Sequence, residues 1–277
     1  MTYFEQIPTG QLSKYIDKFW YCQADDLTNL TLTIPLLHHE LVFNFSDNYC
    51  ISRNSGLDNI LKNQRSWING IQTKPIITRS SGKHEMMGVL FKPNGLKAFT
   101  KFHSSDFENC FIDATLIFDK SFPNLLERLQ NVKTISNKIS LIEIFLRKSL
   151  NTDTFPQYLD TSLDFFSLNT NQRISVRETC NKISVSNKSL IKSYQKYIGV
   201  NPIKYLQLLS INKALQLLSK SPKQSFTRLA YDLNFYDQAH FINLFKSTTS
   251  ITPTQYSDYI LNKKIDASSP NFISLLG

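Results

Sequence analysis

The sequence lacks features on which several protein classes depend. Its four cysteines lie 28, 60 and 70 residues apart, so no CxxC pair exists for zinc binding or redox chemistry, and we expect reduced thiols. No GxSxG, P-loop or GxGxxG motif occurs, which leaves hydrolase, nucleotide and dinucleotide chemistry without support. We therefore expect no catalytic residues, no cofactor and no enzymatic activity.

Long apolar runs are absent too. No segment approaches the roughly 18 consecutive apolar residues that a membrane span requires, and residues 1–8 contain no basic stretch followed by an apolar one. The expected location is the cytoplasm, without contact to a membrane.

Acidic residues are scarce in one third of the chain. Between Arg173 and Lys264 there are 14 basic and four acidic residues, a net charge of +10, whereas the rest of the 277 residues carries a net charge of −1. The overall charge of +9 therefore belongs to the C-terminal part, which is the footprint of a protein that meets a polyanion. Charge alone is equally compatible with a solvated, lysine-rich surface.

Short β-forming runs separated by turn residues fill the first part of the sequence. The runs are Leu30–Ile34, Leu41–Phe45, Tyr49–Ile51, Trp67–Ile68, Ile76–Ile77 and Met87–Phe91. Turn-forming residues separate several of them, at Asp47–Asn48, Asn54–Gly56 and Ser80–Gly82. The pattern predicts a small β-sandwich or cupin-like domain and, with the helical remainder of the chain, an α+β fold.

Helical periodicity follows this β-rich part. A helix is expected over Leu96–Phe102, and a helical pair between Leu125 and Leu150. The apolar faces of this pair could pack within the chain, which we favour, or pair across a two-fold axis in a homodimer.

The remainder is almost purely helical and suggests a division of the chain. A helix over Thr161–Ser167 should end at Asn169–Asn171, and Ser175 with Glu178 three residues later forms a capping box. We expect an N-terminal sensing or dimerisation domain over residues 1–152, a helical domain over residues 153–264 and a flexible tail over residues 265–277.

The helical part contains an internal repeat. Six residues recur with an offset of 51: Ser186, Leu190, Tyr194, Gly199, Pro202 and Tyr205 reappear as Asp237, Phe241, Phe245, Ser250, Pro253 and Tyr256. Each unit has a short helix, a tight turn, an N-cap residue and a second helix with core residues four and eight positions after the cap. The sequence therefore predicts two helix-turn-helix units.

The second helix of each unit has an outward face. If the fourth and eighth positions after the cap face the core, then the second, fifth, sixth and ninth point away from it. These positions hold Lys188, Ile191, Lys192 and Gln195 in the first unit, and Ala239, Ile242, Asn243 and Lys246 in the second. Lysines suit guanine edges or phosphates, Asn and Gln suit adenine, and an apolar side chain suits a thymine methyl group. Taken singly, each residue also fits an ordinary solvated helix face.

The residues from Leu229 to Lys246, followed by Ile251–Tyr256, resemble the signature of AraC/XylS-type bacterial transcription regulators. The resemblance implies two helix-turn-helix units joined by a central helix, here Tyr205 to about Ser219, that set two recognition helices into successive major-groove segments of double-stranded DNA. It adds Gln238 and His240 to the candidate DNA contacts. Activation, the tendency of that family, implies contact with RNA polymerase.

The first half is similar to a β-rich module of unassigned function in a branch of these regulators. The similarity rests on Phe19–Trp20, Leu41–Phe45, Gly70–Thr73 and Gly88–Gly95. For this half we expect binding of a small-molecule effector or dimerisation. A pocket lined by Trp20, Tyr21, Phe43 or Trp67 is one expectation, although aromatic residues in a sandwich are usually core.

Several residues depart from the family pattern. Asn234 and Ser250 stand where Gly is usual, and both must tolerate positive φ. Asn243, Ser210 and Lys192 stand where Arg is common, which removes planar bidentate donors from the DNA-facing side. A target DNA sequence therefore does not transfer from relatives.

Two hypotheses remain at this point. The favoured one is a sequence-specific regulator. The alternative is a ligand-binding or catalytic cupin-like protein whose basic half binds nucleic acid without sequence preference. A metal site has little support, because His38, His39, His84 and His103 include no HxH pair, and a credible site needs defined ligand spacing.

Overall fold

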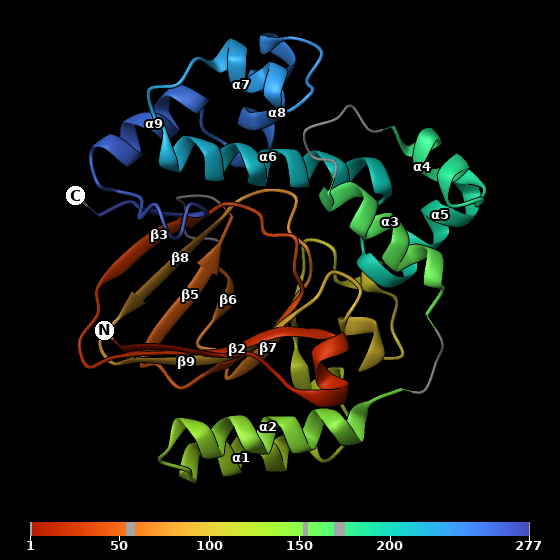
Figure 1. Ribbon diagram of the computed structural model, residues 1–277. Helices are drawn as coiled ribbons and strands as arrows, with labels where there is room; N and C mark the ends of the chain where they lie inside the picture. The colour runs from red at the N-terminus through yellow and green to blue at the C-terminus, as the bar shows by residue number, and fades with distance from the viewer. Residues whose placement is uncertain (1, 54–58, 152–154, 169–174, 277) are drawn as a thin grey trace.

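The computed structural model describes residues 2–53, 59–151, 155–168 and 175–276. The expected turn at Asn54–Gly56, the helix break at Asn169–Asn171 and most of the linker after Asn151 lie outside these residues. In Figure 1, a β-sandwich lies between a pair of helices below and a helical domain above.

The sandwich consists of two antiparallel sheets. Sheet A has the strand order β1-β2-β9-β4-β7-β10, and sheet B has the order β11-β3-β8-β5-β6. The strands are β1 (Thr2–Gln6), β2 (Ile16–Ala24), β3 (Asn29–Thr33), β4 (Glu40–Asn44), β5 (Asn48–Ser52), β6 (Asn59–Lys62), β7 (Ser66–Asn69), β8 (Ile76–Ser81), β9 (His84–Phe91), β10 (Phe111–Asp113) and β11 (Phe272–Ser274). The predicted α+β fold with a β-rich N-terminal part is confirmed.

Alternation along the strands gives sheet A two apolar faces. Phe19 and Tyr21 of β2 belong to the core on the outer face of sheet A, whereas Trp20 and Cys22 belong to the cluster between the two sheets. In β9, Gly88 leaves room for the indole of Trp20, because a Cβ at this position would lie 2.5 Å from its Nε1.

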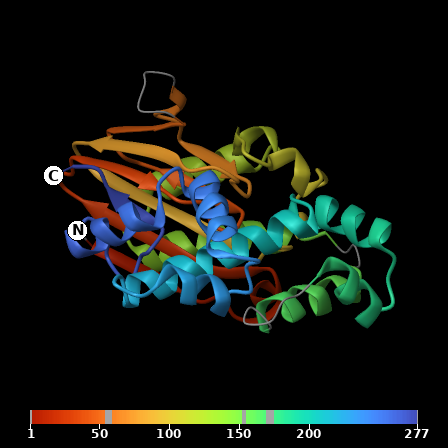
Figure 2. The ribbon, with the colours of Figure 1, turned by 90° about the horizontal axis from the view of Figure 1, so that it is seen from above.

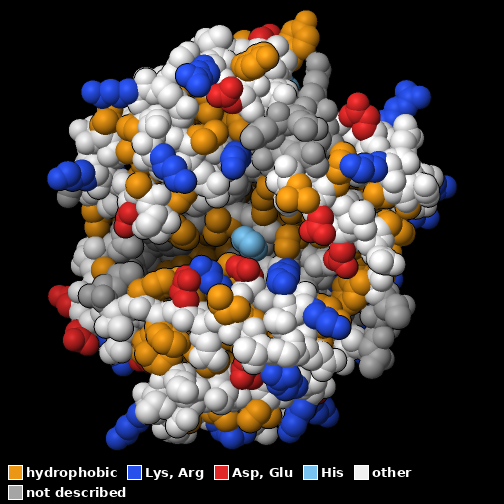
Figure 3. Space-filling view, viewed as in Figure 1, with side chains coloured by type: hydrophobic (Ala, Val, Ile, Leu, Met, Phe, Trp, Pro, Cys, Tyr) orange, Lys and Arg blue, Asp and Glu red, His pale blue; other side chains and the backbone are white. Residues whose placement is uncertain are grey.

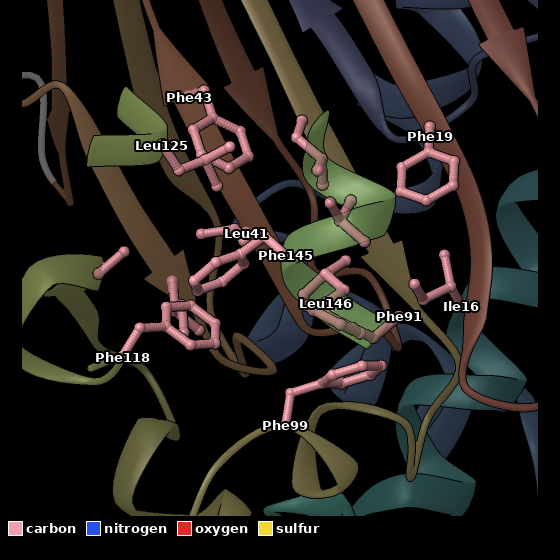
Figure 4. Close-up of a cluster of buried hydrophobic side chains, with 14 of the residues drawn as sticks. Ile16, Phe19, Leu41, Phe43, Phe91, Phe99, Phe118, Leu125, Phe145 and Leu146 are labelled. Atoms are coloured by element: carbon pink, nitrogen blue, oxygen red, sulfur yellow. The ribbon is translucent and has the colours of Figure 1, made fainter. Parts of the chain in front are cut away.

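The helical pair covers the outer face of sheet A. Helix α1 (Phe122–Asn131) and helix α2 (Ile135–Ser149) bury Leu125, Leu129, Ile142 and Leu146 against the sheet. Figure 4 shows Phe145 and Leu146 pointing toward the strands that carry Leu41 and Phe91. The favoured packing within the chain is therefore confirmed. The helix expected over Leu96–Phe102 is only a 3₁₀ turn, Leu96–Ala98.

The helical domain lies over the other side of the sandwich (Figure 2). Its helices are α3 (Gln157–Leu168), α4 (Val176–Lys182), α5 (Asn187–Ser193), α6 (Pro202–Lys220), α7 (Phe226–Asp232), α8 (Gln238–Thr249) and α9 (Pro253–Leu261). One turn of π-helix, Tyr194–Ile198, extends α5. One apolar cluster lies under α3 to α5, and another lies under α7 to α9, with α6 contributing to both.

The tail expected to be flexible contains a short strand. Residues Phe272–Ser274 form β11, which pairs antiparallel with β3, and Ile273 is completely buried. Leu30 O and Asn271 O accept backbone hydrogen bonds from Leu275 and Ile34 on either side of this pairing. The prediction was wrong because three residues after a Pro- and Ser-rich stretch gain their order from the edge of a distant strand.

Within the described residues, every helix is too short or too polar to span a bilayer.

Candidate nucleic-acid interface

The first helix-turn-helix unit is formed by α4 and α5. The predicted capping box is present, since Ser175 Oγ accepts from Glu178 N at 3.1 Å and Glu178 Oε2 accepts from Ser175 N at 2.9 Å. The turn contains Ser184 at φ 55°. Ser186 then caps α5, accepting from Ser189 N at 3.1 Å, as predicted.

The second unit, α7 and α8, follows the same design with a longer turn. Ser225 caps α7, and Asp237 caps α8 by accepting from His240 N at 2.7 Å. Asn234 lies at φ 61°, as its place in the turn required. The two first helices end 50 residues apart but the two caps are 51 apart, so the second turn holds one additional residue.

The repeated residues occupy equivalent places in the two units. Leu190, Tyr194 and Tyr205 are buried, and so are their counterparts Phe241, Phe245 and Tyr256. Pro202 and Pro253 each begin a helix, where a missing N–H costs nothing. The six matches therefore reflect a structural duplication.

Gly199 ends the π-helical turn after α5, and Ser250 ends α8. Both are in the left-handed conformation, at φ 101° and 63°. They differ in surroundings. A Cβ at Gly199 would lie 2.7 Å from Ser104 O and 3.3 Å from His39 Cε1 of the sandwich domain. The first unit therefore requires glycine where the sandwich domain approaches closely, whereas Ser250 is exposed.

The candidate contacts on α5 are exposed. This holds for Lys188, Lys192 and Gln195, and also for the apolar Ile191, which has 39% of its surface accessible. Gln195 lies in the π-helical turn after α5 rather than in α5 itself. These four side chains share the outward side of the helix opposite buried Leu190 and Tyr194.

The candidates on α8 are exposed with one exception. Gln238, Ala239, His240, Asn243 and Lys246 are exposed, whereas Ile242 is half-buried and packs against the core of the second unit. Gln238 Oε1 accepts from Thr227 Oγ1 at 2.6 Å, and the His240 ring meets Phe235 edge-on. The outward placement expected of Ile242 is therefore only partial.

Sequence reasoning missed two tyrosines beside the second unit. Tyr231 and Tyr236 are 82% and 79% exposed. Tyr236 directly precedes the cap of α8, where a phenolic hydroxyl suits a DNA phosphate. Tyr231 lies in α7 and Tyr236 in the turn before α8, and neither position by itself indicates that the side chain is exposed.

The sandwich domain contacts the π-helical turn that follows α5. His39 Nε2 lies 2.8 Å from Ile198 O, and Ser104 Oγ donates to Tyr197 O at 2.9 Å. A carbonyl oxygen only accepts, so neutral His39 carries its proton on Nε2. The buried Nδ1 has no hydrogen-bond partner among the described residues, and burial lowers the pKa of His39 to about 4.

A second contact joins α6 to the sandwich. Asn212 Nδ2 donates to Pro35 O at 3.1 Å, and Asn271 Nδ2 donates to Asn212 Oδ1 at 2.8 Å. The central helix is therefore fixed at its midpoint to the loop after β3 and to the segment that leads into β11.

The consecutive residues His38, His39 and Glu40 face three different partners. His38 Nδ1 lies 3.1 Å from Phe91 O, and Trp20 Nε1 donates to Glu40 Oε1 at 2.6 Å. Burial raises the pKa of Glu40. Among the described residues, no group of three or more His, Cys, Asp or Glu side chains is arranged to hold a metal ion.

The four aromatic residues named as pocket candidates do not share a cavity. Tyr21 and Phe43 are buried against α1 and α2, whereas Trp67 is buried between the sheets, stacked on Tyr49. Trp20 is half-buried on that inner side.

The second helix of each unit borders a cleft that a residue of the sandwich domain also lines. Ile191 and Gln195 border a cleft of about 630 Å³ together with Glu108. Asn243 and Lys246 border one of about 620 Å³ together with Arg53 and Lys74. Figure 3 shows the Lys and Arg side chains of the helical domain dispersed rather than gathered into one patch on the face that it displays.

Comparison with known proteins agrees with this geometry. Residues 179–259 match the model of a helix-turn-helix domain family, and residues 5–113 match a domain family of unknown function. The chain carries an AraC-type helix-turn-helix domain. This domain follows an N-terminal domain of unknown function.

Individual relatives are distant. An uncharacterized HTH-type transcriptional regulator of Haemophilus influenzae is 30% identical over 73 residues, which are 26% of this chain and 24% of that protein. The chain thus matches about a quarter of the length of this curated relative.

Solved structures are similar at lower identity. ToxT from Vibrio cholerae is 11% identical, with a TM-score of 0.45 over 87% of this chain and 97% of that one. An AraC-type regulator from Chromobacterium violaceum is 23% identical, with a TM-score of 0.35 over 37% and 91%.

Proposed function

We propose that this chain is a sequence-specific transcription regulator that reads two adjacent major-groove segments, with α5 and α8 as its recognition helices. The observation that carries the proposal is the structural duplication, because both units present an exposed helix face at equivalent positions. Its candidate contacts are Lys188, Ile191, Lys192 and Gln195 on the first helix, and Gln238, Ala239, His240, Ile242, Asn243 and Lys246 on the second.

The linking helix supports simultaneous binding. Helix α6 has 19 residues, so it is about 28 Å long at ~1.5 Å per residue. Successive major-groove segments on one face of the duplex lie roughly 34 Å apart. A rigid spacer of this length keeps two recognition helices near that separation.

We also propose roles for the rest of the chain, with the domain division after residue 152. The N-terminal domain binds a small-molecule effector or forms a homodimer, and the chain activates transcription through RNA polymerase. Support for an effector comes from the hollow near the middle of the face in Figure 3, where hydrophobic side chains gather. Dimerisation would use a surface other than the apolar faces of α1 and α2, which are buried.

The test compares a duplex enriched from a random pool with the random pool itself. Lys192→Ala and Asn243→Ala should weaken binding to the enriched duplex by roughly 1–3 kcal/mol each and affect random DNA less. Lys148→Ala, on exposed α2 surface, is the matched control and should change neither.

Equal losses on both duplexes would reduce Lys192 and Asn243 to phosphate contacts. A steep salt dependence of the wild-type protein with no preference between the duplexes would refute sequence-specific binding.

A further inference from the structure

The cleft beside the second recognition helix combines cations from both domains. Arg53 follows β5 and Lys74 precedes β8, and these neighbouring antiparallel strands pair Ser52 with Ile77. The two cations therefore lie at the same end of sheet B. Across the cleft, α8 contributes Asn243, Lys246 and Ser247.

The cleft carries an excess of positive charge. Arg53, Lys74 and Lys246 line it together with neutral residues. None of the three cations forms an ion pair within the described part of the chain. Like charges around one cleft repel each other, and an anion between them removes that repulsion.

One of these cations is already oriented. Arg53 Nη2 donates a hydrogen bond to Asn109 O in the loop before β10. A guanidinium that is held by a backbone carbonyl loses less side-chain entropy on binding an anion, and its planar fork suits phosphate oxygens. Lys74, by contrast, is exposed.

The position beside α8 identifies the anion. An α-helix with its side chains is about 10–12 Å across and the major groove is about 12 Å wide. A helix in the groove therefore has a sugar–phosphate backbone along each flank. Arg53 and Lys74 lie on the flank of α8 that Asn243 and Lys246 form, where such a backbone would pass.

We propose that Arg53 and Lys74 of the N-terminal domain, with Lys246 of α8, bind a DNA-backbone phosphate beside the second recognition helix. This inference rests on the proposed function, and it gives the N-terminal domain a direct part in DNA binding. The contact is independent of base sequence, and it fixes the register of α8 in the groove.

The experiment measures the affinity of the full chain for the enriched and the random duplex over a series of salt concentrations. Arg53→Ala/Lys74→Ala should weaken binding to both duplexes equally, roughly tenfold near 0.1 M salt. The slope of log K against log salt should become shallower by about 0.9 for each lost phosphate contact.

Two further variants control for charge and folding. Arg128→Ala/Lys133→Ala removes the same charge from exposed residues on and after α1, across the sandwich, and should leave the slope unchanged. Lys74→Glu alone keeps the Arg53 hydrogen bond and should weaken binding at least as much as Lys74→Ala. An equal loss in the α1 control, or an unchanged slope in both cleft variants, would overturn the proposal.

A separate arm tests a free anion as the ligand. Inorganic phosphate is titrated against chloride at constant ionic strength while the melting temperature is recorded. The DNA contact would be overturned if phosphate stabilised the wild type but not the double variant while the double variant kept its full affinity for DNA. The cleft would then be a site for a small anion. Failure of the proposed function appears differently, as a wild-type protein that does not distinguish the two duplexes.

Discussion

At the scale of single residues, the contact between His39 and Ile198 joins the turn after α5 to the sandwich domain. His39 is completely buried, donates one hydrogen bond across the domain boundary, and leaves Nδ1 without a partner among the described residues. Protonation would place a second N–H in a site that offers it no acceptor. Desolvation is the main cause of its lowered pKa, and neighbouring His38 acts in the same direction.

This contact predicts a pH dependence of stability. Because the pKa of His39 is lowered to about 4 in the folded state, its stabilising contribution is complete above the unfolded value of about 6.5 and is lost as pH falls toward 4. At pH 5 the loss should be on the order of 1–2 kcal/mol. Urea unfolding of wild type and His39→Gln should show a stability difference that narrows between pH 7 and pH 5.

The comparison with His39→Gln isolates this residue, because His38 and His84 titrate in both proteins. A difference that stays constant over this pH range would show that His39 is not buried as a neutral imidazole.

At the scale of elements, β11 fastens the end of the helical domain to sheet B. Its side chains alternate, with Phe272 45% exposed and Ile273 fully buried among residues of the second helix-turn-helix unit. One short strand therefore contributes to the sheet and to the core of the helical domain.

Ile273→Ala should lower the free energy of unfolding by about 2–4 kcal/mol, since it removes a large buried side chain. The neighbouring Phe272→Ala, at an exposed position of the same strand, should cost less than about 1 kcal/mol. Chemical denaturation of both variants measures this difference, and similar costs would mean that β11 is not docked in solution.

Local signals explain which elements the sequence could predict. The caps Ser186 and Asp237 follow from short-range preferences, and the structure confirms them. The positive φ at Asn234 and Ser250 and the central helix α6 were expected from the family resemblance, and the structure contains them too. Strand β11 and the contact of His39 with Ile198 depend on partners more than 150 residues away. The hydrophobic periodicity within one segment does not predict a contact with so distant a residue.

The candidate nucleic-acid interface, too, was only partly predictable from local sequence patterns. The exposed faces of α5 and α8 followed from helical spacing, whereas Arg53, Lys74 and Glu108 lie beside these helices only through the packing of the two domains. Their positions in the sequence, in and around short strands, gave no reason to place them near DNA.

At the scale of the whole molecule, the nearly neutral N-terminal half supplies charges of opposite sign to the two units. Cations of this half flank α8, whereas Glu108 lines the cleft that Ile191 and Gln195 border. Burial raises the pKa of Glu108, and the charge of Lys204 opposes that effect. An ionised carboxylate beside α5 would repel a DNA backbone.

Glu108→Gln should therefore raise the affinity for enriched and random duplexes alike, by roughly threefold to tenfold, because it removes one repulsive charge from the DNA path. Fluorescence anisotropy at two salt concentrations measures the change, which should shrink at the higher one. Glu127→Gln, on the exposed surface of α1, should have little effect. An equal gain in both variants would indicate a general charge effect rather than a local one.

Strand β11 also gives the molecule a particular mechanical character. The polypeptide leaves the sandwich after α2 and returns to it at β11, so the helical domain is attached to the sandwich at both of its ends. Tension applied between residues 2 and 276 would load β1 and β11, which are edge strands of their sheets, before it reached either recognition helix. The helical domain would carry load only after β11 had detached.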